Sequence, residues 1–193
     1  MSQSGWSEIA AAGFQARLPW LGGDLQTLRD TLKPPRLPVD LGEPMPVPVA
    51  DGGQLLAVHD HCPDAHGLVL LLHGLGGHSD REGLRRMGLA LQAAGFSVLR
   101  LNLRGAGKGR ALASGTYAAH CNRDLWPVLE HARQLAGGKP LLGAGISLGG
   151  TILLNACLEQ ADALDGLVCT SSPLDLAACS ASIERPRNRI YQR

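Results

Sequence analysis

A serine lies between two glycines in the sequence GISLG at positions 145–149. The pentapeptide follows an apolar run typical of a buried strand and precedes a helical pattern, which is the setting that a G-x-S-x-G nucleophile requires. A sharp strand-to-helix turn strains the serine backbone and leaves no room for side chains at Gly145 and Gly149. The helix N-terminus behind Ser147 favours the negative charge that develops when a serine attacks. The pattern predicts a nucleophilic Ser147; a glycine-rich turn without chemistry is the alternative.

A second glycine-rich loop, HGLGG at positions 73–77, directly follows the first strongly apolar run. An acyl-transfer site needs backbone N–H donors where the negative oxygen of the tetrahedral intermediate forms. We expect the N–H groups of Leu75 and of Leu148, the residue after the serine, to form this oxyanion hole. The two loops follow strands that we expect to be neighbours in one sheet, so each motif strengthens the other.

Apolar strands alternate with amphipathic helices through most of the chain, which predicts an α/β fold with a mostly parallel sheet and helices on both faces. Ligands of such sheets bind at the carboxyl ends of the strands, where both glycine-rich loops lie. The predicted strands are residues 54–59, 68–72, 96–103, 141–145 and 167–170. The predicted helices are residues 81–94, 124–136 and 151–158. We expect Asp124 to be the N-cap of the second helix, with Pro127 in its first turn.

Prolines are dense between Leu18 and Val49, and they include Pro34, Pro35, Pro38, Pro44, Pro46 and Pro48. Proline lacks an N–H and fixes φ, so this density favours an extended arm over helix or sheet. The turn residues 51–53 then suit a hairpin. We therefore divide the chain into a Pro-rich N-terminal arm, residues 1–50, and an α/β domain, residues 51–193.

The amino-acid composition of the chain argues against several classes of protein. The 193 residues are 45% hydrophobic, with eighteen basic and seventeen acidic side chains and a formal net charge of +1. One sizeable core is expected, and neither a nucleic-acid surface nor an anionic-membrane patch is indicated. The five cysteines show no metal-finger spacing and are expected to be reduced thiols. The N-terminus has no signal-peptide or transmembrane pattern, so we expect a cytoplasmic protein.

Five longer segments carry a more specific pattern: HGLGGHSD (73–80), NLRGAGKG (102–109), GISLGG (145–150), SSPLDLAACS (171–180) and RNRIYQR (187–193). Together they resemble the YheT-like branch of the α/β hydrolases, the AB hydrolase 4 family. PWLGGDLQTL (19–28) is similar to the P-W-x-x-G-G-H-x-Q-T arm of that family, although Asp24 stands where a histidine is usual. The resemblance implies an α/β-hydrolase fold, an acyl-enzyme on Ser147 and a small ester or lipid substrate. It implies a short-chain carboxylesterase or acylglycerol lipase-like enzyme without a cofactor.

The resemblance also implies a triad in the chain order Ser, acid, His, with the histidine beyond the last strand. No histidine follows Ser147, because all seven precede it. We therefore expect a partial α/β-hydrolase domain, truncated before the last strands of the fold and inactive as it stands. Asp175 suits a helix N-cap better than a triad acid. The alternative is a non-catalytic pseudo-hydrolase that binds acyl groups or a partner.

Two clusters have competing interpretations. His59, His61 and His66 with Cys62 could bind a metal, but solvated histidines at a strand edge explain them better, and we predict no metal site. The loop GAGKG at 105–109 fails both nucleotide-binding patterns, because it lacks the Ser or Thr of a phosphate loop and the last glycine of a dinucleotide fingerprint.

Two further histidines, His73 and His120, are not expected to replace the triad histidine. His73 resembles a loop histidine that orients the backbone, and His120 is expected to be a loop residue.

The strand at 167–170 is expected to form an apolar, unprotected sheet edge, which would favour self-association.

Overall fold

The computed structural model describes residues 15–34, 36–186 and 188, and the chain divides into two compact units, Met1–Leu37 and Pro38–Arg193. Within its described residues the first unit contains the helix α2 (Gly22–Leu32). The expectation of a wholly extended arm is therefore wrong. The prolines flank this segment but none lies inside it, and Asp24 in the first turn and Arg29 in the last complement the helix dipole.

The second correction to the arm is the strand β1 (Glu43–Pro48), which forms an antiparallel hairpin with β2 (Gln54–Asp60). The expected hairpin turn at 51–53 joins the two strands. Pro44, Pro46 and Pro48 occupy alternate positions, so their missing N–H groups all face the outer side of an edge strand. Three prolines at a period of two are thus compatible with a strand at a sheet edge. The division of the chain into an arm, residues 1–50, and a domain, residues 51–193, stays a prediction.

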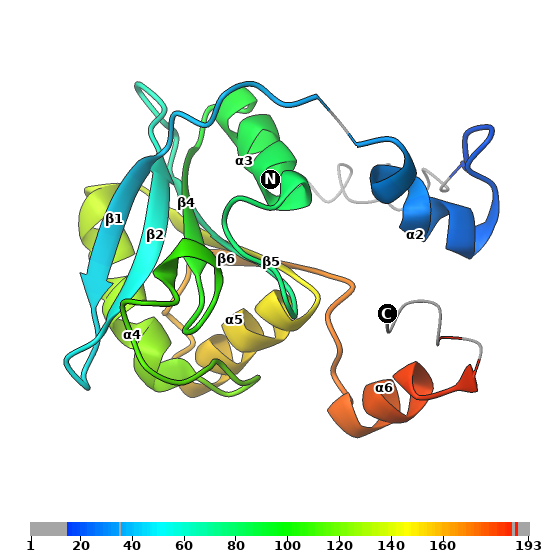
Figure 1. The fold of residues 1–193 in the computed structure, drawn as a ribbon. Coiled ribbons are helices and arrows are strands. Elements are labelled where there is room, and N and C mark those ends of the chain that lie inside the picture. Colours follow the sequence, from blue (N-terminus) through cyan, green and yellow to red (C-terminus); the bar gives the residue numbers. More distant parts are fainter. Residues whose placement is uncertain (1–14, 35, 187, 189–193) are drawn as a thin grey trace. The chain divides into compact units, whose positions relative to one another are not determined.

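The second unit is built on a six-stranded sheet in the order β1-β2-β4-β3-β5-β6 (Figure 1). Its other strands are β3 (Leu68–Leu72), β4 (Ser97–Asn102), β5 (Leu141–Ile146) and β6 (Gly166–Thr170). These four strands run parallel to one another, whereas β2 pairs antiparallel with β4. The mostly parallel sheet of the predicted α/β fold and all five predicted strands are confirmed.

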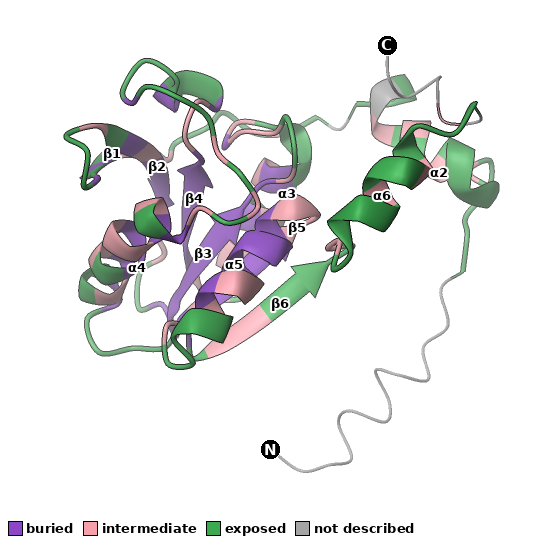
Figure 2. Cartoon of the chain, turned by 90° about the horizontal axis from the view of Figure 1, so that it is seen from below, coloured by how far each residue is buried: buried purple, intermediate pink, exposed green. Residues whose placement is uncertain are grey.

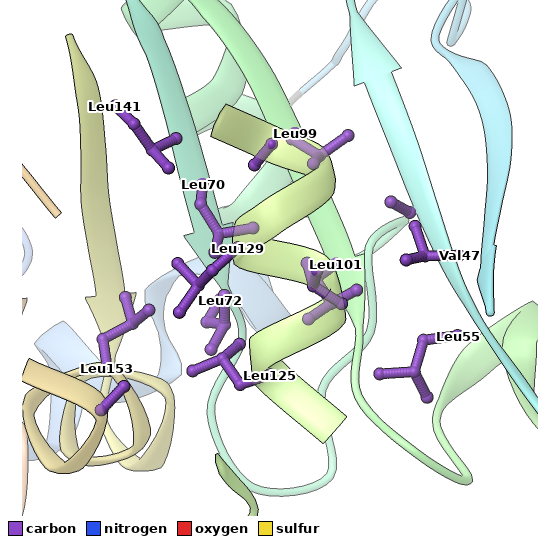
Figure 3. Packing of buried hydrophobic residues seen from close by; sticks show 14 of the residues in the cluster. Val47, Leu55, Leu70, Leu72, Leu99, Leu101, Leu125, Leu129, Leu141 and Leu153 are labelled. Atoms are coloured by element: carbon purple, nitrogen blue, oxygen red, sulfur yellow. The ribbon is translucent and has the colours of Figure 1, made fainter. Parts of the chain in front are cut away.

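Helices cover both faces of this sheet. On one face α3 (Glu82–Ala93) packs on the cluster around Val69, Leu71 and Val98. On the other face α4 (Asn122–Ala136) and α5 (Leu148–Glu159) cover the larger core. Figure 3 shows Leu125 and Leu129 of α4 packed against leucines of β3 and β4.

The N-cap of helix α4 lies three residues earlier than predicted. The cap residue is Cys121, and Pro127 lies inside the helix and not in its first turn. Asp124 is not the cap because its carboxylate binds the Arg104 guanidinium at 2.6 and 2.7 Å. Gly137 ends the helix in the left-handed conformation, as expected.

The chain order creates a switch point in the sheet. From the central strand β3 the chain moves to β4 on one side and then returns to β5 on the other. Crevices at the carboxyl ends of strands form where the order reverses in this way. The loop after β3 and the turn after β5 both lie there, because Leu72 and Gly145 are register partners.

Strand β6 is the last strand of the described sheet, and its burial falls toward its carboxyl end (Figure 2). Val168 is 62% exposed, and no residue of the helix α6 (Leu176–Ile183) is buried. Asp175 caps α6 by accepting a hydrogen bond from the Ala178 N–H at 2.9 Å, which confirms its predicted cap role. The described residues thus leave an apolar strand at this edge.

Candidate active site

Ser147 lies in the turn between β5 and α5 with φ +52° and ψ −125°. A positive φ is strained for a residue with a side chain, and such strain persists only where neighbouring contacts fix it. The Ser147 N–H donates to the Thr170 carbonyl at 2.8 Å, and the Ser147 carbonyl accepts from the Gly150 N–H at 3.0 Å. The hydroxyl does not cap the helix. The turn therefore holds the serine backbone tightly and leaves its oxygen available.

The glycines around Ser147 make this turn sterically feasible. A Cβ on Gly145 would lie 2.3 Å from the Gly150 Cα, and a Cβ on Gly149 would lie 2.5 Å from the His73 carbonyl oxygen. Both distances are shorter than any tolerated contact, and both neighbours are backbone atoms. The predicted elbow glycines are thus required by close backbone approach, and the turn interlocks with the loop after β3.

The loop after β3 approaches the serine directly. A Cβ on Gly74 would lie 3.6 Å from the Ser147 hydroxyl oxygen. The Gly74 carbonyl accepts hydrogen bonds from the His73 ring at 2.7 Å and from the Gly77 N–H at 3.0 Å. Carbonyl and N–H point in opposite directions in a trans peptide, so the Leu75 N–H is turned away from these two donors. Within the described part of the chain, the Leu75 and Leu148 N–H groups donate no hydrogen bond.

His73 holds the loop and is not free to act as a base. The Leu103 N–H donates to its Nε2 at 3.2 Å, so that nitrogen carries no proton and Nδ1–H donates to the Gly74 carbonyl. The side chain is 2% exposed, and burial lowers the pKa of His73 below its usual value. With both ring nitrogens engaged by backbone, the imidazole cannot accept a proton from Ser147.

Other described histidines are also engaged away from Ser147. The His120 Nε2 lies 2.7 Å from a Glu159 carboxylate oxygen, and the His131 Nε2 lies 2.9 Å from the Met45 sulfur. Within the described residues, Ser147 Oγ has no hydrogen-bond partner. The described site therefore combines a serine in a strained turn with two unpaired N–H groups, while the rings of His73, His120 and His131 are engaged elsewhere.

Three residues that no sequence pattern singled out anchor the middle and the far end of this loop. The Asn102 side chain accepts from the Ser79 N–H and donates to the Ser79 hydroxyl, both at 2.9 Å. Arg100, which is 2% exposed, donates to the Ser79 carbonyl at 2.8 Å. Tyr117 accepts the Gly76 N–H at 2.7 Å. Polar residues at alternate positions of the apolar strand β4 were the available signal for Arg100 and Asn102.

Arg100 also joins the segment before β1 to the sheet. Its Nε and Nη2 donate to Asp60 at 2.6 and 2.8 Å, and its Nη1 and Nη2 donate to Asp40 at 3.1 and 2.8 Å. With the bond to Ser79, all five guanidinium N–H groups are used. The hydrogen bonds to both carboxylates outweigh burial and raise the pKa of Arg100 above its usual value. This buried cation is therefore fully paired.

Neither the histidine cluster around His59 nor the GAGKG loop forms a binding site among the described residues. His59 and His61 line a cavity of about 290 Å³ beside Asp40 and Arg100, but the described residues contain no group of three or more metal-binding side chains. In the GAGKG loop, Lys108 pairs with Asp80 at 2.8 Å.

All five cysteines are free thiols, and burial raises the pKa of Cys121 to about 11. That thiol is therefore protonated near neutral pH and is a poor nucleophile. Among the described residues, every helix is too short or too polar to cross a membrane.

Known proteins are similar to this chain in sequence and in fold. Residues 63–189 match the family model Hydrolase_4, described as serine aminopeptidase, S33. Phospholipase ABHD3 of Mus musculus is 32% identical over 160 residues, which cover 74% of this chain and 37% of that protein. Medium-chain fatty acid ethyl ester synthase/esterase 2 of Saccharomyces cerevisiae is 31% identical over 112 residues, which cover 58% of this chain and 23% of that protein. The chain thus spans well under half the length of these curated relatives.

Among solved structures, the Pyrococcus furiosus esterase Pf2001 matches with a TM-score of 0.63 at 19% sequence identity. The match covers 77% of this chain and 62% of that one, and it supports the α/β-hydrolase fold. The family model covers more than half of the sequence, including both loops of the candidate site. The chain therefore belongs to the Hydrolase_4 family of serine aminopeptidase-like α/β hydrolases.

Proposed function

We propose that this chain carries the nucleophile and the oxyanion hole of a serine hydrolase that cleaves carboxylic esters. The Ser147 oxygen attacks the ester carbonyl, and the Leu75 and Leu148 N–H groups stabilise the oxyanion of the tetrahedral intermediate. The alcohol then leaves with a proton, and water hydrolyses the acyl group from Ser147. The observation that carries the proposal is the strained Ser147 backbone beside two unpaired N–H groups.

The mechanism needs a base to take the Ser147 proton, and no histidine follows Ser147 in these 193 residues. His73 does not fill this role, because the Leu103 N–H occupies its Nε2. We therefore propose that the chain by itself turns over esters very slowly, because the 193 residues offer Ser147 no triad base. No cofactor enters this mechanism.

The ester class is suggested by the relatives. One is named a phospholipase and another a medium-chain fatty acid ethyl ester synthase/esterase. We propose a small ester or a lipid ester as the substrate, in the range from short-chain carboxylesters to acylglycerols. Within the superfamily, the segments quoted above favour the YheT-like AB hydrolase 4 branch. A cytoplasmic location also remains part of this proposal.

A non-catalytic acyl-binding or partner-binding protein is the second candidate. The unpartnered Ser147 hydroxyl and the engaged His73 ring favour it, because they leave the nucleophile without activation. Such a protein would keep the site as a binding pocket.

Covalent labelling separates the two candidates. The full chain is incubated with an alkyl fluorophosphonate, with and without free imidazole as a base in solution, and the adduct is located by tandem mass spectrometry. The hydrolase proposal predicts slow labelling at Ser147 that imidazole accelerates, and no adduct in Ser147→Ala. Failure to label Ser147 at any imidazole concentration would contradict it and favour the binding protein.

A further inference from the structure

Tyr117 connects two loops that are far apart in sequence. It lies in the segment between β4 and α4, and its hydroxyl oxygen accepts the Gly76 N–H at 2.7 Å. Its ring stands edge-on to the His73 imidazole, with centroids 5.6 Å apart and planes at 83°. One side chain therefore contacts both the histidine that begins the loop after β3 and a peptide in the middle of that loop.

The peptide that Tyr117 holds lies next to the candidate oxyanion donor. Leu75 is flanked by two peptide groups, and the first is fixed by the bonds from His73 and Gly77 to the Gly74 carbonyl. The second, between Leu75 and Gly76, has its N–H bonded to Tyr117. Gly76 has φ +67° and open space around its Cα, so its own sterics place little restriction on the turn. Tyr117 supplies the restraint that the glycine lacks.

Tyr117 is itself firmly anchored. Its N–H donates to the Arg104 carbonyl at 3.1 Å. The Arg104 guanidinium binds Asp124, Asp51 at 2.8 Å and the Ser114 carbonyl at 3.0 Å. A cation with several partners thus fixes both ends of the short segment that presents the phenol.

We propose that Tyr117 is a positioning residue of the oxyanion hole, which it maintains by holding the Leu75–Gly76 peptide. The inference rests on the proposed function of Ser147. Tyr117 acts through the loop backbone, and the hydroxyl oxygen is its functional atom. Loss of that oxygen exchanges the protein partner of the exposed Gly76 N–H for water and frees the turn, while the aromatic contact with His73 persists.

The test compares Tyr117→Phe with Thr116→Val in the full chain. Thr116 is exposed in the same segment and has no hydroxyl contact within the described residues, so its variant controls for loss of a hydroxyl. Three quantities are measured: amide exchange at Gly76, the rate of Ser147 labelling by a fluorophosphonate with imidazole, and the Tm. The last reports any general loss of stability.

We expect Tyr117→Phe to raise Gly76 exchange and to lower the labelling rate, each by about three- to tenfold, since one hydrogen bond is lost. Thr116→Val should change neither. Faster exchange with unchanged labelling would overturn the positioning role, and so would unchanged exchange. If the unmodified chain gives no Ser147 adduct, the proposed function fails, and Gly76 exchange alone decides whether Tyr117 holds the turn.

Discussion

Replacing Gly149 by alanine tests the interlocked turn with the smallest added group. The new Cβ would lie 2.5 Å from the His73 carbonyl oxygen and 2.7 Å from that of Leu72. These backbone atoms end the central strand β3 and cannot rotate away as a side chain could. Because both oxygens are closer than 3 Å, overpacking should cost about 2–3 kcal/mol, the upper part of the usual range, and the gain in helix propensity of about 1 kcal/mol offsets only part of it. We expect a net destabilisation of about 1–2 kcal/mol, which lowers Tm by about 2–8 °C for a chain of this length.

The assay is thermal unfolding of the full chain followed by circular dichroism, with two reference variants. Gly83→Ala adds the same methyl group in α3, where nothing lies within 4 Å, and should raise Tm slightly. Ser147→Ala adds no group and should change Tm less than the larger substitutions Gly145→Val and Gly149→Val. Equal melting temperatures for Gly149→Ala and Gly83→Ala would show that the turn accommodates a methyl group at position 149, which would contradict the close backbone contacts described above.

Three further predictions concern the rest of the domain. Arg100→Met should destabilise the fold by about 3–5 kcal/mol in urea unfolding, because it leaves the carboxylates of Asp40 and Asp60 without their buried partner; a loss below about 1 kcal/mol would argue against that pairing. Burial would raise the pKa of Asp40, but the hydrogen bonds and charge of Arg100 outweigh it and hold that pKa below its usual value. A carboxyl group whose pKa is lowered by folding contributes stability above about pH 4, and this stability is lost as the pH falls through the pKa of the folded state. The free energy of unfolding of Asp40→Asn should therefore decrease less on acidification than that of the unmodified chain. Parallel curves of unfolding free energy against pH would contradict this. The open edge at β6 should cause concentration-dependent association in size-exclusion chromatography, which Val168→Lys should reduce; a monomer at all concentrations would remove that proposal.

The candidate turn around Ser147 could be predicted from the sequence because its steric requirements are local. The spacing of Gly145, Ser147 and Gly149 follows from backbone contacts within one strand-to-helix turn, and the five apolar strands are readable from short runs. Strand β1 is harder to predict because dense prolines argue against a strand in general, whereas prolines at alternate positions fit the outer side of an edge strand.

The supports of the loop were harder to predict because they come from distant segments. Tyr117 is 41 residues from Gly76, and no pattern in either segment marks the pair. Asp124 looked like a helix cap, yet the ion pair with Arg104 takes its carboxylate and the helix begins earlier. Tertiary electrostatics therefore decided features that local propensity could not.

Hydrolysis of p-nitrophenyl acetate by the full chain and by Ser147→Ala is the decisive comparison for the proposal that Ser147 is a nucleophile without a base. A serine beside an oxyanion hole but without general-base assistance remains weak, so we predict that the two rates differ by less than about tenfold. A turnover that exceeds the Ser147→Ala rate by several orders of magnitude would contradict the account, because it would require a base among the histidines that precede Ser147.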